Sequence, residues 1–140
     1  MRFTSTRNKN LKVGFEQVIR DCMPPDGGLY VPADVNDLRR WILFTNEHTT
    51  YASVAGAMTL ACVNSEFSPI ICETIATRAF PYEPQLKQLD SSLYELELFH
   101  GPTGWHRDFG VSYLIEALDT ILLMKESNAV ILDVTTSSLA

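Results

Sequence analysis

The sequence of 140 residues has the composition of a globular protein, with 46% hydrophobic and 20% charged residues. Its net charge of −6 argues against partners that are nucleic acids or anionic membrane surfaces, because both are bound through clusters of lysine and arginine. No apolar run at the start resembles a secretory signal, and no stretch is long enough to cross a bilayer, so we expect a cytoplasmic protein without a membrane partner.

The first 84 residues predict mostly helices. This part of the sequence opens with a short strand at 3–6 and a helix over 13–22, which a pair of prolines ends. An extended piece at 29–31 then follows a glycine-rich turn. The helices expected next cover 35–44 with Asp34 as N-cap, 49 or 50 to 63, and 69–79, where Ser68-Pro69 is a strong start signal. Prolines 81 and 84 mark a linker.

The remaining residues predict β-α-β order after residue 93. Residues 93–99 alternate apolar and acidic side chains, which is typical of a strand with Glu95 and Glu97 on its solvated face. A long helix is expected over 108–124 with Asp108 as its N-cap. The β-branched run 129–134 predicts a parallel strand buried on both faces. The carboxyl ends of such strands form the ligand edge, which holds residues 100–108 and 135–140.

Two segments resemble the threonine synthase family. Residues 25–32 read Pro-Asp-Gly-Gly-Leu-Tyr-Val-Pro, and residues 98–110 read Leu-Phe-His-Gly-Pro-Thr-Gly-Trp-His-Arg-Asp-Phe-Gly. The resemblance implies that residues 1–84 form the small, mostly helical N-terminal domain of the family. It implies that residues 85–140 are the first β-α-β unit of a fold type II, tryptophan synthase β-like domain that binds pyridoxal phosphate (PLP), truncated at about the first third of the enzyme. Family members convert O-phosphohomoserine and water into threonine and phosphate, a lyase reaction of threonine biosynthesis.

The resemblance also identifies the central substitution in this sequence. The family carries PLP as a Schiff base on a lysine, and Arg107 stands at that position. A guanidinium is delocalised and stays protonated in proteins, so it does not attack an aldehyde to form an imine. Arg107 could instead hold a phosphate or carboxylate through two hydrogen bonds, but we favour an ordinary exposed arginine. We therefore expect no PLP bound covalently to this chain.

The other candidate site residues follow from the same resemblance. His100, Thr103 and Asp108 belong to the family segment and are expected to contact substrate or cofactor, as are Thr136 and Ser137, which match the start of a substrate loop. Ser138 and Leu139 stand where that loop has glycine and aspartate in the family. No metal site is predicted, because the candidate ligands near this segment are too few to converge on an ion.

Two hypotheses follow for function. The first is a pseudoenzyme, a threonine synthase-like chain that is inactive alone and acts through association, with its own copies or with a complete threonine synthase. The second is a divergent threonine synthase that is active only when a second polypeptide completes the PLP site. The sequence does not separate the first hypothesis from a decayed copy without a selected role.

Overall fold

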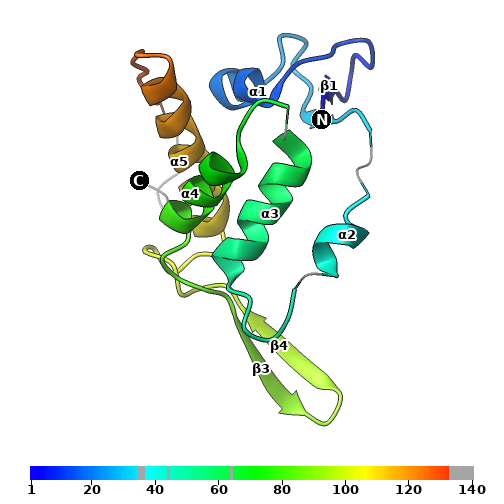
Figure 1. Cartoon of the computed structure of the whole chain (residues 1–140), viewed down its shortest axis with the longest axis vertical. Coiled ribbons are helices and arrows are strands. Elements are labelled where there is room, and N and C mark those ends of the chain that lie inside the picture. Colours follow the sequence, from blue (N-terminus) through cyan, green and yellow to red (C-terminus); the bar gives the residue numbers. More distant parts are fainter. Residues whose placement is uncertain (35–36, 44, 64, 133–140) are drawn as a thin grey trace.

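The computed structural model describes residues 1–34, 37–43, 45–63 and 65–132 of the chain. Helices dominate it, and two separate pairs of short strands accompany them (Figure 1). In chain order the elements are β1 (Phe3–Ser5), α1 (Phe15–Asp21), β2 (Tyr30–Pro32), α2 (Arg39–Ile42), α3 (Tyr51–Val63), α4 (Pro69–Ala79), β3 (Gln85–Asp90), β4 (Leu93–Glu97) and α5 (Asp108–Met124). No helix in the described ranges is long and apolar enough to span a membrane.

The core lies where α3, α4 and α5 pack together, with α1 against the far end of α5. Ala117 and Ile121 of α5 are almost completely buried in this core. The other buried members of the same cluster are Phe15, Ile19, Val63, Phe67, Cys72 and Ile75. The last long helix therefore shares one hydrophobic core with the helices of the first 84 residues. The division at residue 84 stays a prediction.

Local sequence signals explain where the helices of the core begin. Ser68 accepts a hydrogen bond from the Ile71 amide at 3.4 Å, and Pro69 follows it in the first turn, as expected for the start of α4. Thr50 accepts a hydrogen bond from the Ser53 amide at 3.2 Å and so caps α3. These two helices confirm their predicted starts and ends.

The strands form two antiparallel pairs. β1 pairs with β2, with Thr4 opposite Val31, and this confirms the two extended pieces expected near the N-terminus. β3 pairs with β4 in a hairpin that extends away from the helices (Figure 1). The sequence predicted β4 but missed β3, because Gln85–Asp90 follows two prolines and lacks a strict alternation of apolar and polar residues.

Two predicted elements differ from the structure. The helix expected over 35–44 with Asp34 as N-cap is wrong in its start: α2 covers Arg39–Ile42, and the carboxylate of Asp37 accepts the Arg39 amide at 3.1 Å. The strand expected over 129–134 is also wrong for residues 129–132, which have no regular structure and leave Leu132 89% exposed. A parallel strand needs a neighbouring strand for its backbone hydrogen bonds, and residues 129–132 have no strand beside them in the described part of the chain.

The mixed α/β class is confirmed. The β-α part of the predicted β-α-β unit is present as β4 and α5, and residues 133–134 of the second strand lie outside the described residues.

Truncating Ile121 tests whether α5 belongs to the common core. The change Ile121→Ala leaves a cavity beside Phe15 and Ile75, so we expect the free energy of unfolding to fall by about 2–5 kcal/mol in urea titrations. Leu123→Ala on the same helix is the control, because Leu123 is 67% exposed and its loss should change the free energy of unfolding by no more than about 0.5 kcal/mol. Equal effects of the two changes would show that α5 does not pack as described.

Candidate functional site

The motif loop, which we define as residues 98–107, connects β4 to α5 and contains three of the six predicted site residues. Asp108 follows it as the first residue of α5 and is 6% exposed. Its carboxylate accepts two hydrogen bonds from Thr103, from the amide at 2.9 Å and from the hydroxyl at 2.5 Å. The expected N-cap role of Asp108 is therefore wrong: Arg107 occupies the cap position with helical dihedral angles, and Asp108 holds the motif loop.

Hydrogen bonds keep the Asp108 side chain ionised. The pKa of this carboxyl lies below its usual value, mainly because the Thr103 hydroxyl and then the backbone amide of Thr103 donate to it, against the effect of burial. An ionised carboxylate accepts hydrogen bonds only, which suits two donors from one residue. The loop and the helix start thus form one clamped unit.

Gly101 is required by the same clamp. A Cβ built at Gly101 would overlap the carboxylate and the Cβ of Asp108, so any side chain there would push the two apart. The amide of Gly104 also donates to the carbonyl of Gly101 at 3.2 Å, which closes the turn, and Gly104 itself has a left-handed φ of +73°. The glycines of the Gly-Pro-Thr-Gly segment therefore have a steric explanation in this chain.

The end of the motif loop presents an aromatic and basic group to solvent. Trp105 is 45% exposed, and its ring lies against the imidazole of His106 with 5.6 Å between the centroids. The guanidinium of Arg107 lies 5.8 Å from the centre of the Trp105 ring, within the range of a cation–π contact. Arg107 is exposed, and as a cation at the start of a helix it opposes the helix dipole. This arrangement fits the exposed arginine that the sequence favoured.

A second group of polar side chains lies at the beginning of the motif loop. Glu97, the last residue of β4, contacts Lys87 Nζ through Oε1 and His100 Nε2 at 2.9 Å through Oε2. The solvated position expected for Glu97 is wrong, since it is only 5% exposed, whereas Glu95 is exposed as predicted. Lys87 and Glu97 were not predicted as site residues, because their pairing requires β3, which the sequence pattern did not indicate.

The predicted site residues are thus brought together only in part. Thr103 and Asp108 are in direct contact. His100 lies near the start of the same loop and contacts Glu97. Arg107 ends the loop at the surface, and Thr136 and Ser137 lie outside the described residues. Their expected contacts with substrate or cofactor stay predictions.

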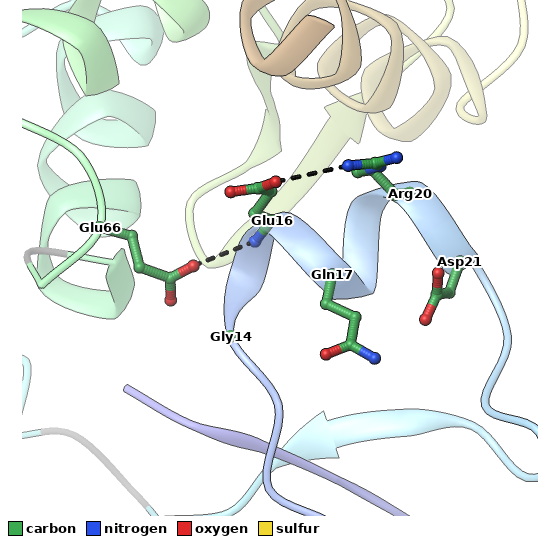
Figure 2. Close-up of a pocket in the computed structure, with 6 residues that line it drawn as sticks. All are labelled: Gly14, Glu16, Gln17, Arg20, Asp21 and Glu66. Carbon is green, nitrogen blue, oxygen red and sulfur yellow. Dashed lines mark hydrogen bonds and ion pairs between the residues drawn. The ribbon is translucent and has the colours of Figure 1, made fainter. Parts of the chain in front are cut away.

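An open groove lies elsewhere, beside α1 (Figure 2). Its volume is about 450 Å³, and it is lined by Gly14, Glu16, Gln17, Arg20, Asp21 and Glu66. Figure 2 shows Glu66 reaching the start of α1, where its two oxygens accept the amides of Phe15 at 2.9 Å and Glu16 at 3.1 Å.

The groove beside α1 is separate from the motif loop. Lys125, just past the end of α5, forms an ion pair with Glu16 at 3.3 Å, which places the groove at the opposite end of α5 from Asp108. A helix of this length spans about 25 Å. Since Glu66 and Glu16 are already paired, the geometry gives these carboxylates a structural role.

Comparisons with known proteins find threonine synthases and threonine synthase-like proteins. The family described as threonine synthase N terminus matches residues 2–80. Threonine synthase of Pseudomonas aeruginosa is 29% identical and aligns with 96% of this chain and 30% of its own length. Threonine synthase-like 2 of Xenopus laevis is 30% identical over 94% of this chain and 29% of its own length. The chain therefore spans about 30% of the length of these relatives.

A solved structure gives the same result in three dimensions. The PLP-bound threonine synthase of Brucella melitensis is similar to this chain with a TM-score of 0.78 and 27% sequence identity. The match covers 90% of this chain and 28% of that protein. The described helices and hairpin thus correspond in arrangement to part of a PLP-binding protein.

A matched pair of glycine substitutions tests the clamp between Gly101 and Asp108. We expect Gly101→Ala to lower the free energy of unfolding by about 1–3 kcal/mol, because its Cβ overlaps the Asp108 side chain. Gly110→Ala has open space around it within α5, so we expect no loss and a gain of up to about 1 kcal/mol from helix propensity. Urea titrations of both variants give the comparison, and a Gly101→Ala variant as stable as Gly110→Ala would contradict the described geometry.

Proposed function

The chain belongs to the threonine synthase family, and we propose that it is a pseudoenzyme of this family that acts through association with another polypeptide. The family reaction releases phosphate from O-phosphohomoserine to form threonine. In our proposal this chain does not perform that reaction by itself and binds no PLP covalently. Its partner is a second copy of the chain or a complete threonine synthase.

The observation that carries the proposal is the position and chemistry of Arg107. The clamp between Asp108 and Thr103 holds the motif loop, so the residue before Asp108 has a defined place at the start of α5. A guanidinium at that place supplies a fixed positive charge but no amine that can alternate between nucleophile and proton carrier. The residues of the loop therefore do not fit a covalently held PLP.

Lys87 does not replace the missing amine. Its ammonium group is paired with the buried carboxylate of Glu97, and this hydrogen bond raises the pKa of Lys87 above its usual value. A nucleophilic lysine needs the opposite shift, toward the neutral amine. The ion pair gives Lys87 a role in joining β3 to β4.

The surface of the chain supports the part of the proposal that concerns association. One face of the hairpin carries Leu86, Leu96 and Tyr94, each more than half exposed. Val111 and Ile115 of α5 are also exposed, as are the apolar residues 130–132. Hydrophobic side chains that are contiguous on a monomer favour association, and the free edges of a two-stranded hairpin can pair with another strand.

The intact clamp favours a second candidate function. Gly101, Thr103 and Asp108 keep their mutual contacts although Arg107 interrupts the family segment. In this alternative the chain is a divergent threonine synthase, and a second polypeptide completes the PLP site and supplies the reactive amine. The two candidates differ in whether the completed complex turns over O-phosphohomoserine.

Borohydride trapping of PLP tests the proposal. The wild-type chain and Arg107→Lys are each mixed with PLP and a complete threonine synthase, reduced with borohydride, digested and mapped by mass spectrometry. We expect no stoichiometric adduct on the wild-type chain, and an adduct at position 107 in Arg107→Lys that exceeds any adduct at position 20 in the control Arg20→Lys by about tenfold. Arg20 is suited to the control because it lies on α1, at the other end of α5 from the motif loop.

Two results would contradict the proposal. One is a stoichiometric adduct on a lysine of the wild-type chain. The other is phosphate release from O-phosphohomoserine that depends on adding the wild-type chain to a partner without activity of its own. The second result would favour the divergent enzyme.

A further inference from the structure

Glu97 differs from every other residue of the hairpin. All residues of β3 and the first four of β4 are exposed, whereas Glu97 is 5% exposed. Burying a carboxylate is costly unless it is paired and hydrogen-bonded. Its position at the junction of the hairpin and the motif loop therefore needs an explanation from its contacts.

Each oxygen of the Glu97 carboxylate has its own partner. Lys87, on the neighbouring strand, contacts Oε1, and the imidazole of His100 contacts Oε2 through Nε2 at 2.9 Å. The Lys87 side chain is 56% exposed and that of His100 is 28% exposed, so the carboxylate is the buried centre of the three groups. The centroids of the Phe99 ring and the His100 imidazole lie 4.8 Å apart, and Phe99 limits how the imidazole can rotate.

The charge of Glu97 determines which nitrogen of His100 carries a proton. Hydrogen bonds from Lys87 first, and then from His100, hold the pKa of Glu97 below its usual value, against the effect of burial. An ionised carboxylate has no proton to donate, so in this contact Nε2 is the donor. In a neutral imidazole the other nitrogen, Nδ1, is then an acceptor. Within the described residues, Nδ1 makes no hydrogen bond.

We propose that Glu97 is a positioning residue, which orients His100 so that Nδ1 accepts a hydrogen bond from an N–H or O–H group of a ligand at the motif loop. Lys87 acts with it by keeping the carboxylate in place. The ligand in this proposal rests on the second candidate function above, the divergent enzyme, because that candidate places a ligand at the motif loop. The orientation of the imidazole does not rest on it and can be measured in the chain alone.

The experiment is nuclear magnetic resonance of the chain labelled with 15N, at a pH where His100 is neutral. For the wild type we expect a pyridine-type signal at Nδ1, and a resolved downfield proton on Nε2 that exchanges slowly with water. In Glu97→Gln we expect that proton to exchange at least about tenfold faster and the two tautomers of His100 to mix. Glu95→Gln is the matched control, since it removes one charge directly opposite Lys87 on an exposed position and should leave the His100 signals unchanged.

A conservative change gives a second readout that separates orientation of the imidazole from folding of the hairpin. We expect Glu97→Asp to retain the folded hairpin but to lose the protected Nε2 proton, because the shorter side chain does not reach both partners. A proton found on Nδ1 in the wild type would overturn the proposal, and so would unchanged His100 signals in Glu97→Gln. Either result is independent of the borohydride experiment, so failure of the orientation and failure of the proposed function can be told apart.

Discussion

The carboxylate of Asp108 is the contact on which the functional part of this chain depends. It accepts hydrogen bonds from the amide and the hydroxyl of Thr103. It also requires a glycine at position 101, because the Cβ of any other residue there would overlap the Asp108 side chain. Asp108 is also the first residue of α5, and Ala117 and Ile121 of this helix are buried in the core. The position of the helix therefore determines the position of the motif loop. The core fixes the helix, the helix fixes Asp108, and Asp108 fixes the loop.

The contacts that hold the family segment in place do not involve the side chain at position 107. Gly101, Thr103 and Asp108 form contacts that have a steric and electrostatic purpose whatever residue precedes Asp108. The guanidinium of Arg107 lies against Trp105 at the surface and takes no part in the clamp. In our proposal Arg107 stands where the family has its amine, and the clamp is a structural contact that does not need that amine. The buried Glu97 at the other end of the loop adds a second fixed group, His100.

The sequence was most informative where a local interaction decides the structure. Ser68 and Pro69 define the start of α4 through one hydrogen bond and one fixed dihedral angle, and both are readable from neighbouring residues. The sequence predicts a structural role for Asp108, but as the N-cap of its helix and not as the acceptor that holds the preceding loop. An aspartate in either role has the same sequence signature. Glu97 was misplaced because alternation assigns it to solvent, while its burial depends on Lys87 from a strand that was not predicted.

The apolar run 129–134 shows the limit of pattern reading. β-branched residues favour a strand, but a strand forms only with a partner, and residues 129–132 have none in the described structure. The same reasoning applies to the leucines of the hairpin, which are exposed in this chain. Their pattern favours a face that packs against another surface, and it does not identify that surface.

Native mass spectrometry of the chain purified from its own cells, with PLP and borohydride added to half of the sample, tests whether the chain associates without holding PLP covalently. We expect a homo-oligomer or a complex with a threonine synthase chain, in which the mass of this chain is the same with and without PLP. A chain whose mass increases by one reduced PLP group would contradict the account, because it would show that Arg107 has not removed the covalent chemistry of the family.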